Sequence, residues 1–374
     1  MKVLHFISGG DTGGAKTHVL TLLPKLKEIG VDVELLCIME GVFTQEAQKL
    51  NIPVNIILQK KRYDLTVIKR IRKFIEENNY DIIHCHGARA NYIAAFIRRK
   101  IKAPMITTLH SDYKLDFKDT LHKQLIYAPI NYFALKRFKY ILTVTEAFKN
   151  MMIDRGFKKD KFFVVYNGIS FDDELSFSSK EDFFKKYCIK FDKDKKYVGI
   201  AARLNVVKGV DVFLKMALDI CQKRNDTNFI IAGDGDDFDK YKSFIEENNL
   251  SDRIFMIGHI NDINSFFNAI DINMLTSLSE SFPYALLEGA RMKKATVSTA
   301  VGGIPEMILQ GETGYLVSPD NISDIAEKVM SLLDNEELAQ KFGQAFFDRV
   351  KENFSDVKMA QTHKSIYEKI VKEN

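Results

Sequence analysis

Short apolar runs alternate with longer amphipathic runs along the chain, and this alternation appears twice. In the first half, the apolar runs typical of strands cover residues 3–8, 33–38, 81–85, 105–109 and 140–144. Amphipathic runs typical of helices lie between them, at 15–29, 65–78 and 88–99. Alternating strands and helices predict a parallel sheet with helices on both faces.

The same pattern starts again in the second half. Strands are predicted at 197–201, 228–232, 253–257, 272–275 and 296–298, and helices at 210–222, 238–248 and 284–292. A chain of 374 residues exceeds what one hydrophobic core usually serves. Residues 169–179 show little periodicity, so we place a boundary near Asn167–Gly168. The sequence therefore predicts the α/β class with two similar domains.

Composition excludes several other classes of protein. Hydrophobic residues make up 46% and charged residues 28%, as in soluble globular proteins. No apolar run approaches the ~18 residues of a membrane-spanning helix, and the first apolar run is too short for a signal peptide. Four distant cysteines without a CxxC pair argue against disulfides and zinc, and predict a cytoplasmic protein.

Charge is distributed unevenly along the chain. Residues 1–168 contain 28 Lys+Arg and 16 Asp+Glu, a balance of +12, whereas the remainder contains 26 and 34, a balance of −8. Basic clusters occur at 60–62, 98–100 and 136–139. No aromatic platforms of a nucleic-acid signature are interleaved with them, so nucleic acid is not a predicted partner. An anionic membrane surface or an acidic acceptor is predicted, with an ordinary solvated surface as the alternative.

A glycine-rich loop at residues 8–14 follows the first predicted strand and precedes a helix. Gly13 and Gly14 would let a ligand approach the backbone, and the free N–H groups of a helix start bind phosphate. The glycine spacing does not fit the G-x-G-x-x-G pattern of dinucleotide-binding loops. A phosphate-binding loop and a structural turn are both open at this point.

Two cations, Arg203 and Lys208, follow the strand predicted at 197–201. Parallel α/β sheets bind ligands at the carboxyl ends of their strands, and two fixed cations there could neutralise a diphosphate without a metal. The alternative is a surface arginine and a lysine at a helix start. The helix dipole opposes a cation at a helix start, which favours the ligand-binding interpretation.

Two glutamates, Glu280 and Glu288, form the sharpest motif. Glu280 lies in the loop after the strand at 272–275, and Pro283 suits the first turn of the helix that carries Glu288. One carboxylate then lies at the helix start and the other on its inner face, where both could accept hydrogen bonds from sugar and ribose hydroxyls. The alternative is a helix with ordinary exposed acids.

Acids and histidines are the candidate metal ligands. Asp234 and Asp236 could hold a metal-bound diphosphate, but acids near a helix start favour a strand-to-helix turn. His84 and His86 share one face of a strand, as metal ligands can, yet no further ligand cluster is evident, so no metal site is predicted. His110 ends the strand at 105–109, on the expected ligand edge, and is a candidate functional residue.

Together these motifs resemble the retaining glycosyltransferases of family 4, whose GT-B architecture has two Rossmann-like domains facing each other across a cleft. The resemblance covers nearly the whole chain, in the family's order, and includes the segments 13–18, 81–87, 108–110, 167–169, 233–235 and 302–306. It implies an acceptor domain at 1–168, joined by a last helix at about 355–374, and a nucleotide-sugar donor domain at 169–354.

The resemblance also implies the roles of single residues. Glu280 and His110 would lie at the reacting sugar. The implied donor-binding residues are Gly13, Gly14, Arg203, Lys208, Ile260, Phe282, Tyr284 and Glu288. Among these, the cations would bind the diphosphate, Glu288 the ribose hydroxyls, and the segment around Ile260 the base. Ser281 stands where many family members have glycine.

The implied reaction moves a sugar from a nucleotide-diphosphate sugar, with a UDP-sugar favoured, to an acceptor hydroxyl with retention of configuration and without a cofactor or metal. The protein would mainly position the substrates and stabilise the leaving diphosphate. A nucleotide-sugar epimerase of the same architecture and a non-catalytic nucleotide-sugar sensor are the alternatives. The Arg203/Lys208 and Glu280/Glu288 spacings favour the transferase.

The acceptor is predicted from charge and resemblance together. In this family the N-terminal domain generally receives the acceptor, and here that domain is basic. We therefore expect a lipid-linked or saccharide acceptor in bacterial envelope polysaccharide or glycolipid synthesis. The enzyme would be cytoplasmic and peripheral on the inner face of the cell membrane.

Overall fold

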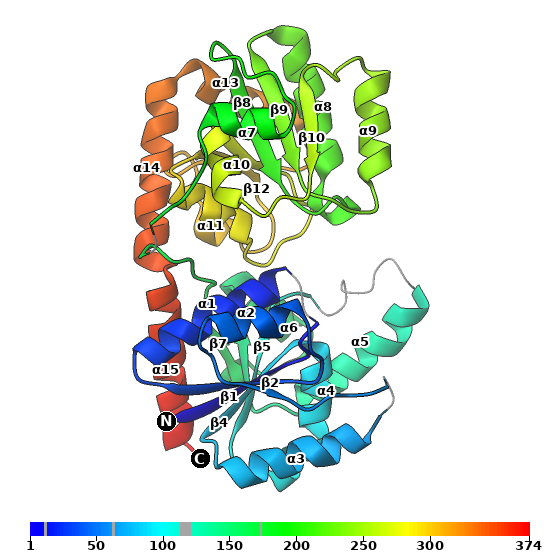
Figure 1. Cartoon of the computed structure of the whole chain (residues 1–374), viewed down its shortest axis with the longest axis vertical. Coiled ribbons are helices and arrows are strands. Elements are labelled where there is room, and N and C mark those ends of the chain that lie inside the picture. Colours follow the sequence, from blue (N-terminus) through cyan, green and yellow to red (C-terminus); the bar gives the residue numbers. More distant parts are fainter. Residues whose placement is uncertain (11–12, 62–63, 113–120, 173) are drawn as a thin grey trace. The chain divides into compact units, whose positions relative to one another are not determined.

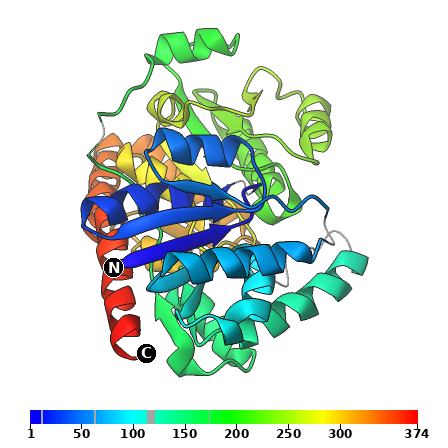
Figure 2. The ribbon, with the colours of Figure 1, turned by 60° about the horizontal axis from the view of Figure 1, so that its bottom comes forward.

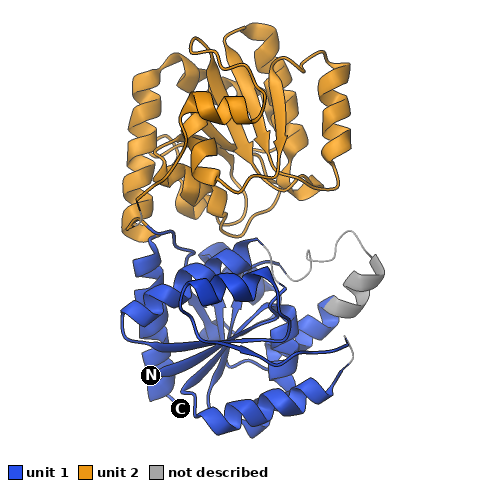
Figure 3. Ribbon diagram, viewed as in Figure 1, with its two compact units in different colours: residues 1–170, 355–374 blue, residues 171–354 orange. Residues whose placement is uncertain are grey.

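The computed structural model describes residues 1–10, 13–61, 64–112, 121–172 and 174–374, without the side chains of residues 121–127. Two compact units are present (Figure 3): Met1–Ser170 with Ser355–Asn374, and Phe171–Phe354. The sequence prediction places the end of the first domain at residue 168. Ile169 stays with the first unit because it pairs with Ser355 and its carbonyl oxygen accepts a hydrogen bond from Asp356 N at 3.1 Å.

The first unit contains a parallel sheet in which the described strands lie in the order β3-β2-β1-β4-β5-β6-β7 (Figure 1). These strands are β1 (Lys2–Ile7), β2 (Asp32–Cys37), β3 (Val54–Ile56), β4 (Ile82–His86), β5 (Met105–Leu109), β6 (Tyr140–Thr143) and β7 (Phe162–Val164). The central strands β4 and β5 are buried over their whole length, as expected for a sheet covered by helices on both faces.

The described helices of the first unit are α1 (Gly14–Glu28), α2 (Val42–Lys49), α3 (Thr66–Asn78), α4 (Gly87–Ile97), α5 (Leu121–Lys136), α6 (Glu146–Asp154) and α15 (Asp356–Lys372). Short 3-10 turns cover Arg98–Lys100 and Lys159–Lys161. The last helix, α15, lies beside α1 in both views (Figures 1 and 2). Its apolar face, which includes Met359, Ile366 and Ile370, is buried in the core of the first unit.

The second unit repeats this architecture, with the described strands in the order β10-β9-β8-β11-β12-β13. The strands are β8 (Lys196–Ala201), β9 (Thr227–Ala232), β10 (Ile254–Gly258), β11 (Ile272–Leu275), β12 (Ala295–Thr299) and β13 (Tyr315–Val317). The helices are α7 (Lys180–Lys186), α8 (Val210–Lys223), α9 (Phe238–Glu247), α10 (Ile263–Ala269), α11 (Tyr284–Arg291), α12 (Ile304–Met307), α13 (Ile322–Asp334) and α14 (Glu336–Asn353). A 3-10 turn, Val206–Lys208, precedes α8.

Each sheet has one topological switch point, where the strand order reverses its direction. It lies between β1 and β4 in the first sheet and between β8 and β11 in the second. Open α/β sheets bind ligands outside the carboxyl ends of the strands at such a point. The predicted fold class, α/β with two Rossmann-like domains, is confirmed.

The sequence pattern does not predict three of the described strands, β3, β7 and β13. Each has three residues and lies at the edge of its sheet, so its apolar run is too short to stand out from a loop. In the described part of the chain, no helix combines the length and the apolar composition that crossing a bilayer requires.

Candidate functional site

Two predicted site residues meet at the switch point of the second sheet. Lys208 follows β8 and Glu280 follows β11, and their Nζ and Oε1 atoms are 2.5 Å apart. The same carboxylate oxygen accepts a hydrogen bond from Ser277 Oγ at 2.6 Å. Strand order thus makes an ion pair between residues that are 72 positions apart in the sequence.

The two partners differ in their access to solvent. The side chain of Lys208 is 27% exposed, whereas that of Glu280 is 8% exposed. The carboxylate is therefore held inside the loop, and the ammonium group stands at its outer side. A phosphate oxygen that reaches this edge would meet a cation able to form a charge-assisted hydrogen bond.

Glycines allow the loops around this pair to pack backbone against backbone. Gly209 has φ of +60°, and a Cβ there would lie 2.1 Å from the carbonyl oxygen of Thr276. Gly302 has φ of +54°, and a Cβ there would lie 1.7 Å from the carbonyl oxygen of Glu280. Both positions require glycine for conformation and for space, so they hold Lys208 and Glu280 at their present separation.

Arg203 follows β8 at the same edge of the sheet. It is exposed, and its guanidinium group forms no hydrogen bond or ion pair with any residue that the structure describes. The backbone N–H of the next residue, Leu204, donates to the carbonyl oxygen of Asp234 at 2.9 Å and ties this loop to the one after β9. The predicted cation pair thus comprises Lys208, which is held by a carboxylate, and Arg203, whose side chain is exposed and has no partner among the described residues.

Tyr284 and Glu288 lie one turn apart on α11 and so share a face of the helix. Burial raises the pKa of Glu288 to about 7, although Arg291 opposes the rise. Burial, and then the nearby Glu288, raise the pKa of Tyr284 well above its usual value. Tyr284 Oη is buried without a hydrogen-bond partner among the described residues. A ligand that carries hydroxyl groups could satisfy both side chains.

The side chains of two other predicted donor-binding residues, Phe282 and Ile260, pack against apolar neighbours. Phe282 is 3% exposed, and its ring packs edge-on against Phe354 with centroids 5.1 Å apart. Any contact of Phe282 with a ligand would therefore use its backbone. Ile260 follows β10, and two strands, β9 and β8, lie between β10 and β11. Its side chain packs against a buried apolar cluster of the second unit. It lies at the carboxyl edge, but away from the Lys208–Glu280 pair.

In the first unit, the glycine loop follows β1 and His110 follows β5. Asp11 and Thr12 of the loop lie outside the described residues. Gly13 precedes α1 with φ of +70°, and Gly14 begins the helix. A Cβ at Gly14 would meet no described atom within 4 Å, so the first turn of α1 borders open space. Its free N–H groups suit an anion.

His110 is partly buried and is held by other histidines. Its Nε2 lies 3.1 Å from Nδ1 of His86, and its ring meets that of His18 edge-on, with centroids 4.7 Å apart. Burial lowers the pKa of His110 well below its usual value, so the ring is neutral at neutral pH. The sequence pattern indicates His86 but not its link to His110. It does not indicate Ser277 either, because no local signal separates this residue from other loop serines.

The acidic segment after β9 is a strand-to-helix turn. Asp234 accepts a hydrogen bond from the backbone N–H of Gly235 at 2.8 Å, and Asp237 precedes α9. In the described ranges, neither Asp234 nor Asp236 belongs to a group of ligand atoms close enough for one metal ion. The groups that do are two histidine trios, His5 with His84 and His86, and His18 with His86 and His110.

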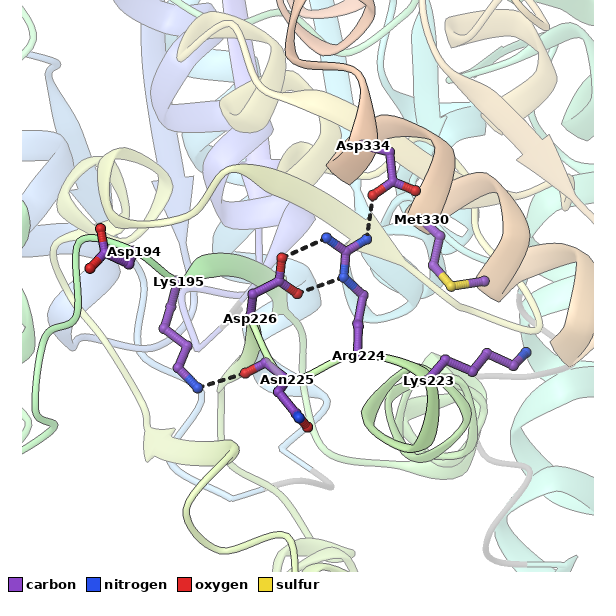
Figure 4. Close-up of a pocket in the computed structure, with 8 residues that line it drawn as sticks. All are labelled: Asp194, Lys195, Lys223, Arg224, Asn225, Asp226, Met330 and Asp334. Atoms are coloured by element: carbon purple, nitrogen blue, oxygen red, sulfur yellow. Dashed lines mark hydrogen bonds and ion pairs between the residues drawn. The ribbon is translucent and has the colours of Figure 1, made fainter.

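A surface cavity of about 610 Å³ on the second unit lies elsewhere. Figure 4 shows Arg224 between Asp226 and Asp334, with N–O distances of 2.7 to 2.8 Å, and Lys195 Nζ 2.7 Å from the carbonyl oxygen of Asn225. These residues precede β8 and β9 or end α13, which places the cavity at the amino edge of the sheet. Its Arg224 is already paired with acids, and we assign no ligand to it.

Two family descriptions match the chain, one for each unit. Glycosyltransferase Family 4 matches residues 12–173, and glycosyl transferases group 1 matches residues 180–348. An uncharacterized glycosyltransferase of Methanocaldococcus jannaschii is 27% identical over 365 residues, which cover 96% of this chain and 95% of the relative. The N-acetyl-alpha-D-glucosaminyl L-malate synthase of Bacillus anthracis is 25% identical over 325 residues, or 85% of this chain and 82% of the relative.

Solved structures of the same fold include Anabaena HepE in complex with UDP. It matches with a TM-score of 0.84 at 19% sequence identity, and the match covers 99% of this chain and 100% of HepE. The complex of HepE with UDP-glucose matches with a TM-score of 0.83 at 19% identity, over 98% of this chain and 99% of HepE. The chain shares the fold of these structures.

Proposed function

The chain belongs to the glycosyltransferases of group 1 and family 4, and we propose that it transfers a sugar from a nucleotide-diphosphate sugar to an acceptor hydroxyl. We favour a UDP-sugar as the donor, because HepE, which has the same fold, binds UDP and UDP-glucose. We further propose retention of the anomeric configuration, as in the retaining enzymes that the motifs resemble.

The observation that carries this proposal is the Lys208–Glu280 pair at the switch point, on the same sheet edge as Arg203. Negative charge grows on the diphosphate as its bond to the sugar breaks, and cations fixed there stabilise that transition state. In the proposed complex, Lys208 exchanges its contact with Glu280 for a diphosphate oxygen. Glu280 is then free to accept hydrogen bonds from the donor sugar, and Arg203 supplies a second positive charge.

Positioning does the remaining work in the proposed mechanism. Glu288 and Tyr284 bind the ribose or sugar hydroxyls, and the first turn of α1 at Gly13 and Gly14 lies against the donor. His110 stands beside the reacting sugar as a neutral imidazole. The acceptor hydroxyl attacks on the face from which the diphosphate leaves. Its oxygen bonds to the anomeric carbon as the bond from that carbon to the phosphate oxygen breaks, and its proton passes to the leaving diphosphate, so no covalent nucleophile is needed. Two cations take the place that a metal has in other transferases, and we propose a metal-independent enzyme.

An exposed apolar–basic patch on the first unit supports a lipid-linked acceptor or membrane docking. The patch consists of Met39, Val42, Leu58, Lys60, Lys61 and Leu65. Its apolar side chains are between 38% and 65% exposed. Arg89 connects two of its loops, because it donates hydrogen bonds to Gln59 Oε1 at 3.0 Å and to Met39 Sδ at 3.2 Å. The patch follows β2 and β3 and thus lies at the carboxyl edge, as do Gly13 and His110.

The other predicted basic clusters lie at the opposite edge of the sheet. Arg98–Lys100 directly follow α4, and Lys136–Lys139 begin with the last residue of α5. Both helices run back to the amino edge, and Arg98 donates a hydrogen bond to the carbonyl oxygen of Arg137. Arg62 of the first cluster lies outside the described residues. We propose that the apolar–basic patch docks on the anionic inner face of a bacterial cell membrane. The acceptor would then be a lipid-linked or saccharide precursor of the envelope.

The test of the proposed function is a screen of nucleotide sugars for binding, donor hydrolysis and transfer. Glu280→Gln should lower kcat roughly 10–100-fold, as expected for the loss of a charged hydrogen bond in the transition state. Glu352→Gln, an exposed acid on α14, is the matched control and should keep full activity. The activity should also survive excess chelator.

Other outcomes would contradict specific parts of the proposal. Full activity of Glu280→Gln would remove the role of Glu280. An epimer formed from the donor alone would indicate an isomerase, and donor binding without turnover would indicate a sensor. Activity that is lost with chelator and restored by manganese or magnesium would contradict metal independence.

A further inference from the structure

Buried histidines gather in the core of the first unit, where β1, β4 and β5 meet α1 and α15. They are His5, His18, His84, His86, His110 and His363, six of the eight histidines in the chain. All except His110 are at most 1% exposed. Buried polar rings cost free energy unless they find hydrogen-bond partners, so the stability of this cluster depends on how its rings are paired.

Four of the histidines belong to one hydrogen-bonded chain that ends on His110. It runs from Thr108 through His84, Tyr367, His5 and His86 to His110. The successive distances are 2.7 Å (Thr108 Oγ1 to His84 Nε2), 2.6 Å (His84 Nδ1 to Tyr367 Oη), 3.4 Å (Tyr367 Oη to His5 Nε2), 3.0 Å (His5 Nδ1 to His86 Nε2) and 3.1 Å (His86 Nδ1 to His110 Nε2). Nδ1 of His110, at the end, forms no hydrogen bond with any described residue.

The ring geometry fits hydrogen bonds rather than a metal ion. The rings of His5 and His86 are 13° from parallel with centroids 5.3 Å apart, and those of His86 and His110 are 23° from parallel with centroids 5.4 Å apart. In each pair, the distance between ring centroids equals the N–N distance plus about one centre-to-nitrogen length for each ring. The nitrogens therefore point at each other within nearly one plane, as a linear hydrogen bond requires. Zinc ligands instead point their lone pairs at a shared third point.

Every ring in the chain is neutral, because burial lowers the pKa of His5, His84, His86 and His110 well below the usual value. Burial also raises the pKa of Tyr367 well above its usual value and keeps its hydroxyl protonated. A neutral imidazole has one N–H and one lone pair. Each ring that donates on one side must therefore accept on the other.

Only two arrangements satisfy every link of the described chain and also give the proton of the Tyr367 hydroxyl an acceptor within it. In one, Thr108 donates to His84, His84 to Tyr367, and so on to His110, and all four imidazoles carry their proton on Nδ1. In the other, each donor becomes an acceptor, and all four carry it on Nε2. A mixed arrangement would place two protons or two lone pairs face to face, or would make Tyr367 Oη accept from both His84 and His5 and leave its buried proton without an acceptor among the described residues. Either is costly in a buried site.

We propose that this chain sets which nitrogen of His110 carries the proton, and thereby whether His110 Nδ1 donates or accepts a hydrogen bond at the substrate. His86, His5, Tyr367 and His84 are then positioning residues that act through His110. Tyr367 lies on α15, so the last helix contributes to the state of a residue that follows β5. The role of His110 at the substrate rests on the proposed function. The shared tautomer of the four histidines does not depend on it.

The decisive measurement needs no variant and no substrate. In protein labelled with ¹⁵N-histidine, two-bond couplings between ring nitrogens and carbon-bound protons distinguish the Nδ1–H from the Nε2–H form. We expect His5, His84, His86 and His110 to show the same form. Different forms within the wild-type chain would overturn the proposal. So would added Zn²⁺ that binds and removes the N–H signals, because the cluster would then be a metal site.

Tyr367→Phe interrupts the chain and leaves the ring in place. We expect His84 to become independent of the other three rings and His110 to show a mixture of forms. Once a donor is known, kcat should fall roughly tenfold, while KM for the donor stays unchanged. Tenfold is the lower end of the effect, about 10–100-fold, of removing groups that orient histidines in metal sites. An unchanged form of His110 together with an unchanged kcat would overturn the positioning role.

His363→Gln is the matched control. His363 is equally buried in the same cluster and lies on the same helix as Tyr367, but its Nδ1 bonds to the carbonyl oxygen of Met359, outside the chain. The four forms and kcat should stay as in the wild type. If no nucleotide sugar is turned over while the four histidines share one tautomer, the proposed function fails and the inference about the hydrogen-bonded chain stands. If the four histidines show different tautomers in an active enzyme, the inference about the hydrogen-bonded chain fails and the proposed function stands.

Discussion

At the scale of single residues, Glu288 shows how burial changes an ordinary side chain. Its pKa rises from 4.5 to about 7, mainly because burial disfavours the charged form. A carboxyl group with a raised pKa binds its proton more tightly in the folded than in the unfolded protein. Its contribution to stability is therefore complete below about pH 4.5 and is lost as the pH rises through 7.

We predict that Glu288→Gln removes this pH dependence. The wild type should lose on the order of 3 kcal/mol relative to the variant between pH 4.5 and pH 8, as the shift implies. Urea unfolding of both proteins at the two pH values measures the difference. Donor affinity of the wild type should rise with pH through 7, because the ionised carboxylate accepts hydroxyl hydrogen bonds better. Parallel pH profiles of variant and wild type would contradict the assignment.

Gly302 offers a second test at this scale. Alanine there would place its Cβ 1.7 Å from the carbonyl oxygen of Glu280. We predict that Gly302→Ala displaces the Glu280 loop, lowers kcat by at least about tenfold and costs roughly 1–3 kcal/mol of stability. Steady-state kinetics and thermal unfolding measure the two effects.

The control for this substitution is Gly311→Ala. Gly311 also has a positive φ, +74°, but a Cβ there meets no described atom within 4 Å. The variant should show only the cost of the left-handed conformation, about 1 kcal/mol, with full activity. Equal losses of activity in the two variants would mean that strain, and not the displaced Glu280, is the cause.

At the scale of secondary-structure elements, α15 determines how the first unit is completed. The helix begins at Asp356, where the Ser355 hydroxyl accepts a hydrogen bond from Lys358 N at 3.3 Å. Its buried face then supplies core side chains to strands that come more than 200 residues earlier, and Tyr140 Oη donates to Glu373 Oε2 at 3.0 Å. The first unit is thus built from both ends of the described chain.

We predict that core substitutions in α15 destabilise the first unit selectively. Ile370 is completely buried, and Ile370→Ala should cost about 2–5 kcal/mol through lost burial and a cavity. Val371, the next residue, is 40% exposed, and Val371→Ala should cost less than about 0.5 kcal/mol. Hydrogen exchange should show faster exchange in β1 and β4 for the first variant only, while β8 and β11 exchange as in the wild type. A uniform increase across both sheets would contradict the independence of the two cores.

At the scale of the whole molecule, charge and exposed apolar surface separate the two halves of the chain. The basic half, residues 1–168, carries a balance of +12. The fold sorts its basic clusters to opposite edges of the sheet, and apolar side chains accompany Lys60 and Lys61. A cluster that combines lysines with exposed apolar side chains suits a membrane surface better than cations alone.

We predict salt-sensitive binding of the whole protein to anionic vesicles through this patch. Charge reversal of Lys60 and Lys61 together should weaken binding roughly tenfold or more, since each Lys near an anionic surface contributes about 1 kcal/mol. The matched control reverses Arg98 and Arg99 at the amino edge and should change binding little. Cosedimentation across a salt series measures both. Equal binding to neutral and anionic vesicles, or equal losses in the two variants, would contradict docking through the patch.

Local sequence accounts for the alternation of elements and for the residue types of the site. Predicted bounds agree within about one residue with β5, β8 and β11, because periodicity and glycine turns act over a few neighbouring positions. In a parallel α/β sheet, the residues that follow each strand lie at its carboxyl edge. Local sequence alone therefore suffices to place Arg203, Lys208, Glu280 and Glu288 near the carboxyl edge.

Which of these residues touch, and which protonation state they adopt, depends on how distant elements pack. The pairing of Lys208 with Glu280 depends on β8 lying beside β11, and the pKa of Glu288 depends on the low-dielectric surroundings of α11. Phe282 was turned into the core by packing that no local pattern encodes. The histidine chain joins residues up to 362 positions apart. Such contacts arise only when distant elements pack, because hydrogen bonding and burial depend on distance in space and not on distance along the chain.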